Sequence, residues 1–235
     1  MPKKEEAQKK REEKLLAERE RVAGMRAFEK DALLAKFGPD FFPELTEGKN
    51  ILICGIDEAG RGPLAGPGVA GAVILPEDCE ILGLNASKQL TAGKRDELYG
   101  EIMEKAVACG VGIVGPARID EIIILQADYE AMCEAIGTLT VMPQILLNDA
   151  VRIPQVLIPQ IPIVHGDARS LSIAAASVIA KVTRDRLMME YDAVYPEYGF
   201  AKHKGDGTAE HYAALKKYGP CPIHRKSFLR TLPEH

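Results

Sequence analysis

The chain has 235 residues, of which 46% are hydrophobic, 6% aromatic and none tryptophan, and its formal net charge is −4. This length suits one domain with its own core plus an appendage, while the acidic balance and scarce aromatics exclude a strongly basic nucleic-acid-binding protein and argue against a base-stacking platform. No apolar run is long enough to span a membrane, the Lys/Glu-rich N-terminus is no secretory signal, and the five cysteines include no CxxC pair, so we expect a cytoplasmic protein with reduced thiols.

Residues 2–36 are rich in Lys, Glu, Arg, Ala and Leu, with apolar residues at roughly helical spacing, and this pattern predicts one or two exposed helices. Gly38, Pro39 and Pro43 then break the pattern. We therefore divide the chain into a charged helical N-terminal extension, residues 1–48, and a body, residues 49–235. The extension is either a solvated helix that packs weakly on the body or a basic arm that touches nucleic acid. Its interleaved Lys and Glu favour the first interpretation.

The body alternates apolar, β-rich segments with helical ones. Strands are expected at residues 50–56, 69–75, 111–114, 144–147 and 161–164, and helices at about 91–108, 119–139, 171–191 and 208–218. Early strands followed by strand–helix alternation indicate an α/β domain with a mixed sheet.

Acidic residues follow three of the expected strands: Asp57 with Glu58, Asp149, and Asp167. Functional groups collect where strands end, and hard divalent cations prefer carboxylate oxygens together with water and substrate phosphate. Two such ions can clamp a phosphoryl displacement, so these acids predict a site that cuts nucleic acid. Each acid could instead be a turn or capping residue. This interpretation suits the adjacent pair Asp57 and Glu58 least, because unpaired charges at the edge of a core are costly. Both acids of the pair serve one site only if the strand bends at Glu58, since successive strand residues face opposite ways.

A glycine-rich segment that contains Gly60, Arg61 and Gly62 comes directly after the acidic pair. Glycines let the backbone approach a ligand closely, and an arginine supplies a planar fork for phosphate. A plain surface loop is the alternative. The position behind two acids favours a ligand-binding loop.

Several ordered motifs are similar to those of one known family, ribonuclease HII, the bacterial type 2 ribonuclease H. The resemblance runs from about residue 51 to residue 228. Its blocks are Asp57–Pro67 (DEAGRGPLAGP), Leu84–Leu90 (LNASKQL), Ala174–Asp185 (AAASVIAKVTRD), Tyr198–Phe200, His203–Gly205 and Pro222–Phe228 (PIHRKSF). So many matches in the same order make chance similarity a poor explanation.

The resemblance implies an RNase H-like fold with a mixed central sheet flanked by helices and a C-terminal helical portion. It implies that Asp57, Glu58, Asp149 and Asp167 are both catalytic and metal-binding, with two divalent ions, Mg²⁺ or Mn²⁺, in the reactive complex. The implied activity is hydrolysis of the RNA strand of RNA–DNA hybrids and cleavage on the 5′ side of single ribonucleotides in duplex DNA, with 3′-hydroxyl and 5′-phosphate products. We expect a monomer that binds these nucleic acids and no membrane.

The resemblance also implies which residues bind the substrate. RNA differs from DNA by its 2′-hydroxyl, which the Gly-Arg-Gly loop reads in the family. Residues 87 and 88 match a phosphate-contacting segment, and one face of the long helix carries Ser, Lys and Arg at helical spacing. The expected substrate-binding residues are Gly60, Arg61, Gly62, Ser87, Lys88, Ser177, Lys181 and Arg184. Core packing by the helix serine and salt bridges by its lysine and arginine are the alternative, and residues 224–226 are either another phosphate patch or a solvated terminus.

Four positions depart from the family pattern. Asp206 replaces the Tyr that usually follows His-Lys-Gly and stacks near the reactive ribose. His165 replaces the Lys usual before Gly-Asp, with loss of a fixed positive charge near Asp167. Ile123 stands where Asn is usual, and Gly68 stands where a β-branched residue is usual. The first two departures bear on substrate recognition and rate, not on metal binding.

Two alternative functions remain at this point. Ribonuclease HIII would have a larger N-terminal substrate-binding domain and typically Lys in place of Arg61, so both features argue against it. The second alternative is a nucleic-acid-binding or clamp-interacting homologue with weakened catalysis, which depends on Asp206 and His165. Contact with a replication clamp is not readable from the sequence.

Overall fold

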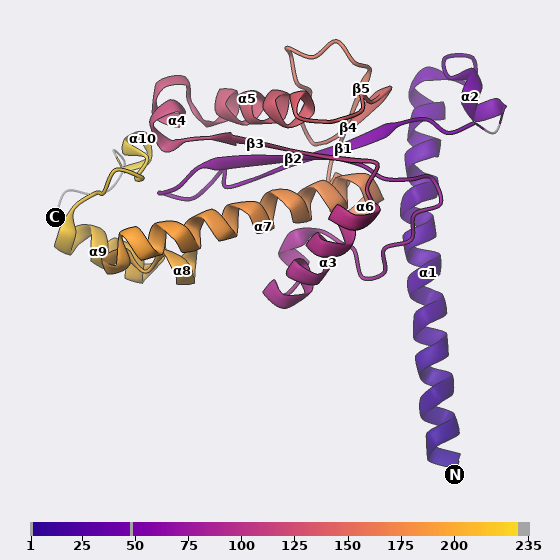
Figure 1. The fold of residues 1–235 in the computed structure, drawn as a ribbon, viewed down its shortest axis with the longest axis horizontal. Coiled ribbons are helices and arrows are strands. Elements are labelled where there is room, and N and C mark those ends of the chain that lie inside the picture. Colours follow the sequence, from indigo (N-terminus) through magenta and orange to yellow (C-terminus); the bar gives the residue numbers. More distant parts are fainter. Residues whose placement is uncertain (1, 48, 230–235) are drawn as a thin grey trace.

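A five-stranded sheet forms the centre of the computed structural model, which describes residues 2–47 and 49–229 (Figure 1). The strands lie in the order β3-β2-β1-β4-β5. Their bounds are β1 (Ile53–Ala59), β2 (Gly68–Ile74), β3 (Ala108–Val114), β4 (Ile145–Asp149) and β5 (Gln160–Ile163). β2 pairs antiparallel with β1 and β3, whereas β4 pairs parallel with β1 and β5. The sheet is therefore mixed, as predicted.

Helices cover both faces of the sheet. α7 (Leu171–Val194) packs against β1 and β2, and α5 (Ile124–Gly137) packs against β2 and β3 on the opposite face (Figure 1). A Cβ atom built on Gly71 would lie 2.5 Å from the carbonyl oxygen of Ala176, so a glycine in β2 permits the close approach of α7. The core is accordingly split into one apolar layer under α7 and another under α5.

The helix expected over residues 119–139 is broken into α4 (Pro116–Ile122) and α5. Ile123, between them, has φ +65° and ψ 155°. That conformation belongs essentially to glycine, so the backbone is strained here. The prediction of one helix was wrong because apolar residues keep their helical spacing on both sides of the break.

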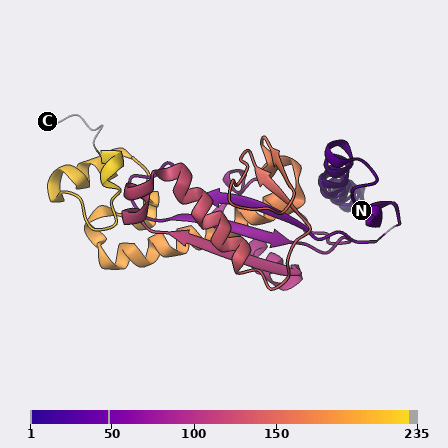
Figure 2. The ribbon, with the colours of Figure 1, turned by 90° about the horizontal axis from the view of Figure 1, so that it is seen from above.

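α1 (Pro2–Phe37) is one long helix at the end of the sheet opposite the C-terminal portion (Figure 1, Figure 2). Its N-terminal half projects away from the body, whereas Val22, Met25 and Leu33 in its second half are buried. Glu29 is fully buried and accepts a hydrogen bond of 2.7 Å from the N–H of Ser172 in the first turn of α7. The expectation of weak packing is therefore wrong for the second half of the extension, which caps the longest helix of the body.

The remaining elements are short or belong to the C-terminal portion. They are α2 (Pro43–Thr46), η1 (Ser87–Gln89), α3 (Ala92–Lys105), α6 (Gly166–Arg169), η2 (Pro196–Tyr198), α8 (Phe200–His203), α9 (Ala209–Tyr218) and α10 (Lys226–Leu229). The C-terminal portion holds the loop that follows β1, because Leu64 N–H donates to the carbonyl of Gly205 (2.9 Å). Within the described ranges, no helix has the length and apolarity needed to cross a bilayer.

Candidate active site

The predicted acids gather at one end of the sheet. β1 and β4 run parallel, in a register that places Asp57 and Asp149 on neighbouring strands. Asp149 accepts a hydrogen bond of 2.7 Å from the N–H of Gly166, which begins the short helix that carries Asp167. The fold therefore brings together carboxylates from three separate stretches of the chain.

Negative charge is crowded at this end of the sheet. Burial raises the pKa of Asp57 well above its usual range, and the charges of Glu58 and Asp149 raise it further. Burial and the charge of Asp149 also raise the pKa of Asp167, while the ammonium of Lys88 opposes that shift. Burial raises the pKa of Glu58 to about 7. These carboxylates repel one another, so a bound cation would stabilise their charged forms.

The four acids fit a divalent cation. They present hard oxygen donors, and the buried Oε2 atom of Glu58 has no hydrogen-bond partner within the described structure. Because a buried, unpaired carboxylate oxygen is costly, this atom indicates a ligand such as Mg²⁺ or Mn²⁺. Among the residues that the structure describes, no group of three or more Asp, Glu, His or Cys side chains is arranged to hold a metal ion by itself.

β1 keeps regular pairing with β2 through Glu58 and Ala59, so the bend expected if both acids serve one site is absent. The strand continues through Ala59, so the two adjacent acids leave it on opposite faces. Asp57 faces α7, where it forms a hydrogen bond with Ser177, and Glu58 faces α5. The charge of Asp149 nevertheless raises the pKa of both acids, so both border the same charged region.

The Gly60–Gly62 loop lies beside Glu58. Gly60 has φ +98°, and a Cβ atom there would lie 2.2 Å from Nε of Arg184, so this position requires glycine. Arg61 forms ion pairs with Glu58 through Nη2 (3.0 Å) and with Asp128 through Nε (2.7 Å). The loop thus brings its backbone and a guanidinium to the acids.

Two buried arginines hold the backbone of this loop and of the residues that follow it, up to residue 67. Arg184 is 2% exposed and donates to the carbonyl oxygens of residues 65, 67 and 204 at 2.9–3.1 Å. Arg225 has no exposed surface and donates to the carbonyls of residues 60, 61 and 66 at 2.6–3.1 Å. Arg184 therefore lies in the interior, not on a nucleic-acid-facing surface as expected. His224 and Arg225 are buried, so they form neither a phosphate patch nor a solvated terminus, and only Lys226 of residues 224–226 is exposed.

The other expected substrate-binding side chains fall into two groups. Ser87 and Ser177 are buried with their Oγ atoms 2.7 Å apart, and Ser177 hydrogen-bonds to Asp57, so the serines orient an acid from inside. Lys88 is exposed, and Lys181 is half-buried with an ion pair to an acid one turn along α7 (2.7 Å). Of these four side chains, only the two lysines are exposed enough to contact a phosphate.

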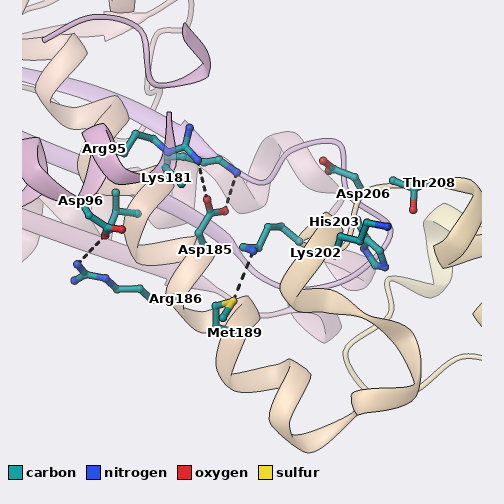
Figure 3. Close-up of a pocket in the computed structure, with 13 residues that line it drawn as sticks. Arg95, Asp96, Lys181, Asp185, Arg186, Met189, Lys202, His203, Asp206 and Thr208 are labelled. Carbon is teal, nitrogen blue, oxygen red and sulfur yellow. Dashed lines mark hydrogen bonds and ion pairs between the residues drawn. The ribbon is translucent and has the colours of Figure 1, made fainter. Parts of the chain in front are cut away.

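A pocket of about 540 Å³ lies between α3, α7 and α8 (Figure 3). Lys181 lines it one helical turn after Ser177, and the exposed Asp206 lines it on the side of the C-terminal portion. Its basic residues outnumber its acids: Arg95, Lys181, Arg186, Lys202 and Lys204 against Asp96, Asp185 and Asp206. This excess of positive charge suits a nucleic-acid backbone.

Sequence reasoning missed Asp128. It is 2% exposed on α5, burial raises its pKa, and the hydrogen bond from Arg61 opposes that rise. A signal was present, because Asp128 lies in the stripe of α5 that includes the buried Ala127, Ala131 and Ala135. An acid on the buried stripe of a helix needs a partner, and carboxylates are almost never fully buried without one.

Carboxylates from neighbouring strands and a glycine-rich loop, on a mixed sheet covered by helices, define a metal-dependent endoribonuclease with the RNase H-like fold. Residues 54–231 match the family model described as Ribonuclease HII. The chain belongs to the ribonuclease HII family, which cleaves the RNA strand of RNA–DNA hybrids. The family assignment predicted from the motifs is thus confirmed, and ribonuclease HIII is excluded as the family.

Curated relatives and solved structures agree with this assignment. The chain is 59% identical over 222 residues to Ribonuclease HII of Lachnoclostridium phytofermentans, which covers 94% of this chain and 82% of that relative. It is 58% identical over 182 residues to Ribonuclease HII of Clostridioides difficile (77% and 71% covered). Ribonuclease H2 from Pyrococcus horikoshii is similar with a TM-score of 0.63 and 30% identity (74% and 92%). The structure of the PCNA:RNase HII complex from Archaeoglobus fulgidus matches with a TM-score of 0.62 and 26% identity (79% and 97%).

Proposed function

We propose that this enzyme also cuts on the 5′ side of single ribonucleotides in duplex DNA, and that it uses two divalent ions and leaves a 3′-hydroxyl and a 5′-phosphate. The observation that carries the proposal is the unpartnered, buried Oε2 atom of Glu58, among mutually repelling carboxylates and beside the Gly60–Gly62 loop. Membership of the ribonuclease HII family supports it.

Asp57, Glu58, Asp149 and Asp167 would hold the ions, which supply activation of water and neutralisation of the phosphate that is cut. Main-chain and hydroxyl donors fix the acids beforehand: the N–H of residue 166 donates to Asp149, and Ser177 hydrogen-bonds to Asp57. Because these donors already hold the carboxylates in place, the acids need no reorganisation when an ion and the substrate bind.

The Gly60–Gly62 loop supplies recognition of the ribose. Its carbonyls at residues 60 and 61 accept hydrogen bonds from Arg225, which fixes the orientation of the loop backbone. A site built to hydrogen-bond a hydroxyl strongly rejects an analogue that lacks it, because the polar groups of the site are then left unpaired. An all-DNA duplex would therefore bind without being cut.

Basic side chains around the acids supply contacts to phosphate. Lys88 is exposed next to Asp167, and Lys181 leads into the basic pocket of Figure 3. Such contacts position a duplex without reading its sequence, and they weaken as salt concentration rises.

The decisive experiment is cleavage of a DNA duplex that carries one ribonucleotide, with an all-DNA duplex and an RNA–DNA hybrid as companions, in Mg²⁺ and in Mn²⁺. We expect a single cut 5′ of the ribonucleotide and none in the all-DNA duplex. Asp57→Asn should lose cleavage by on the order of 10³-fold or more. It should still fold, with a melting temperature no lower than that of the parent, because the substitution removes a buried charge that its neighbours repel. Retained activity in this variant would remove Asp57 from the mechanism.

A second candidate is a homologue that binds nucleic acid with weakened catalysis. It is favoured by Asp206, an exposed acid on the basic pocket, and by His165, which is exposed two residues before Asp167. Tight binding of the ribonucleotide-containing duplex, with no cut under either metal, would select this function.

A further inference from the structure

The Arg61 guanidinium bridges two carboxylates that lie deeper in the protein than it does. Nη2 is 3.0 Å from Oε1 of Glu58, and Nε is 2.7 Å from Oδ2 of Asp128. The Arg61 side chain is 43% exposed, against 13% for Glu58 and 2% for Asp128. Glu58 belongs to the expected metal site, whereas Asp128 lies outside it. The two ion pairs therefore have different roles.

Glu58 has a competing ligand. Its carboxylate is shared between Arg61 and the place where a divalent cation is expected, since Oε2 is buried and unpartnered. A cation that draws this carboxylate toward itself weakens the bond to Arg61. Arg61 cannot depend on Glu58 alone for its position in the reactive complex.

Asp128 has no such competitor. The cations Arg61 and Arg225 stabilise its charged form, and its anionic neighbour, Glu58, shares the Arg61 guanidinium with it. Its carboxylate lies on the buried stripe of α5, where loss of the guanidinium would leave an uncompensated buried charge. The pair with Arg61 is therefore retained whether or not Glu58 binds a metal.

Gly68 lies beside this acid. A Cβ atom built on Gly68, the first residue of β2, would lie 3.8 Å from Oδ1 of Asp128 and 4.0 Å from Cδ1 of Ile119, which is ordinary van der Waals contact. A methyl group fits there, whereas a β-branched residue adds two γ atoms to a position that is already in contact with both side chains. The family pattern has a β-branched residue at position 68. In this chain a glycine stands there, and the facing helix α5 carries the buried Asp128.

We propose that Asp128 is a positioning residue that anchors Arg61, and through it the Gly60–Gly62 loop, against the ribose of the substrate, and that Gly68 makes room for it. The role of Asp128 rests on the proposed function, because Arg61 matters only if its loop distinguishes a ribonucleotide. Asp128 touches neither the expected metal nor the reacting phosphate; it acts through the guanidinium.

The test measures binding in an Asp57→Asn background, where the substrate stays uncut. Affinities are determined for a duplex with one ribonucleotide and for the matched all-DNA duplex, in Mg²⁺. Asp128→Ala should lower the ratio of the two affinities by about fivefold to tenfold, the loss expected for one charge-assisted hydrogen bond, with all-DNA binding unchanged. Asp128→Asn should have a smaller effect, because its amide oxygen still accepts from Nε. Glu130→Ala, on the same helix and with a side chain 42% exposed, is the matched control and should leave the ratio unchanged.

Arg61→Ala in the same background separates the role of Asp128 from the proposed role of the Gly60–Gly62 loop. If Arg61→Ala leaves the ratio at the parent value, the guanidinium has no part in ribose recognition, and that part of the proposed function fails. If Arg61→Ala lowers the ratio and Asp128→Ala does not, the proposed function stands and the role of Asp128 is overturned. A purely structural Asp128 would lower the melting temperature and leave the ratio unchanged, which also overturns the proposal.

A double-mutant cycle tests the pairing of Gly68 with Asp128. Gly68→Val should lower the melting temperature of the parent, and should do so less in Asp128→Ala, where the carboxylate no longer fills the space. Additive shifts would overturn the link between the two positions. Melting temperatures need no activity, so this arm also reports on variants that bind nucleic acid poorly.

Discussion

The Nη2 atom of Arg225 donates a hydrogen bond of 2.6 Å to the carbonyl oxygen of Gly60, across 165 residues of the chain. The same guanidinium has no exposed surface and reaches two further carbonyls of the loop, at residues 61 and 66. Burial, together with the charge of Arg184, lowers the pKa of Arg225 to about 9. A buried cation near the C-terminus therefore fixes the backbone next to the expected catalytic acids.

Replacement of Arg225 by Lys should loosen this loop. An ammonium keeps the charge but cannot reach three carbonyls from one planar fork. Leaving buried carbonyls unpaired costs about 1–3 kcal/mol, which lowers the melting temperature of a domain of this size by roughly 2–4 °C per kcal/mol. We also expect the KM for a ribonucleotide-containing duplex to rise about tenfold, equivalent to ~1.4 kcal/mol. Calorimetry and steady-state kinetics measure the two effects.

The exposed neighbour Lys226 provides the control for that substitution. Lys226→Ala removes a positive charge from the same segment without disturbing the carbonyls of the loop, so it should leave both quantities near their parent values. A parent-like KM in Arg225→Lys would show that the loop keeps its shape without the guanidinium fork.

Local sequence signals located the sheet and the four acids. Buried strands appear as short apolar runs, and the acids follow them because charges cannot remain inside the core. The helix expected from about residue 91 is also confirmed, since α3 begins at Ala92 and the hydroxyl of Thr91 accepts from the N–H of Lys94 (3.3 Å). Such features involve residues within a few positions of one another, which is the distance over which sequence patterns are informative.

Long-range partners could not be predicted in this way. Helical spacing placed Arg184 on the same face as Lys181, but it could not show that loop carbonyls lie opposite that arginine. Asp128 and Arg225 likewise acquire their roles from the loop at residues 60–66, which packs on them only in the folded chain. Periodicity shows which residues share one face of a helix, but it does not show which part of the chain packs against that face.

The break at Ile123 predicts a stabilising substitution. The residue is 65% exposed at φ +65° and ψ 155°, so its side chain gains little from burial while its backbone is strained. Strain of this kind costs of order 1–3 kcal/mol, and glycine relieves it. Ile123→Gly should therefore raise the free energy of unfolding by about 1 kcal/mol, measured by urea denaturation.

A glycine two residues later serves as the matched control for Ile123→Gly. Leu125 is 39% exposed in the first turn of α5, where glycine replaces a good helix former at a cost of up to about 1 kcal/mol. Opposite signs for Ile123→Gly and Leu125→Gly would confirm the strain. Destabilisation by both would contradict it.

Two buried histidines in the C-terminal portion require neutral rings. Nδ1 of His211 lies 2.9 Å from the carbonyl oxygen of Asp206, so this nitrogen carries the proton. Nε2 of His211 then accepts from Nε2 of His224 (2.9 Å), whose Nδ1 accepts from the N–H of Cys221 (2.9 Å). A proton added to either acceptor nitrogen would break this chain of hydrogen bonds.

The two histidines should therefore contribute less to stability in acid. Burial, together with the charge of His211, lowers the pKa of His224 to about 4, whereas an unfolded imidazole has a pKa of about 6.5. The unfolded chain takes up the proton first, so this contribution is complete above pH ~6.5 and is lost as the pH falls toward 4. We expect the His224 contribution to fall by about 1–2 kcal/mol between pH 7 and pH 5, measured by urea denaturation as the difference between the parent and a variant that lacks this imidazole.

A non-titrating variant isolates this effect from the buried acids, whose raised pKa values act in the opposite direction. His224→Gln keeps an N–H that can donate to His211, so its stability should depend less steeply on pH than that of the parent. Equal slopes in the parent and His224→Gln would contradict the assignment.

Asp206 offers the most direct gain of function. Its backbone is fixed, because its N–H donates to the carbonyl of His203 (2.9 Å) and its own carbonyl accepts from His211, while its side chain is exposed on the basic pocket. A substitution there therefore changes the side chain and leaves the loop in place. The family pattern has Tyr here, and stacking of an aromatic ring on a nucleotide is worth about 1–3 kcal/mol.

Asp206→Tyr should accordingly raise kcat/KM on a duplex with one embedded ribonucleotide by about fivefold to tenfold, since each 1.4 kcal/mol is worth about tenfold. Asp206→Asn separates the two causes, because it removes the charge that repels phosphate without adding a ring. An increase confined to the Tyr variant would show that stacking is the missing contribution, whereas equal increases would assign the effect to charge. An unchanged or lower rate in Asp206→Tyr would mean that this enzyme confirms the ribonucleotide with other groups, such as the Gly60–Gly62 loop that Arg225 holds.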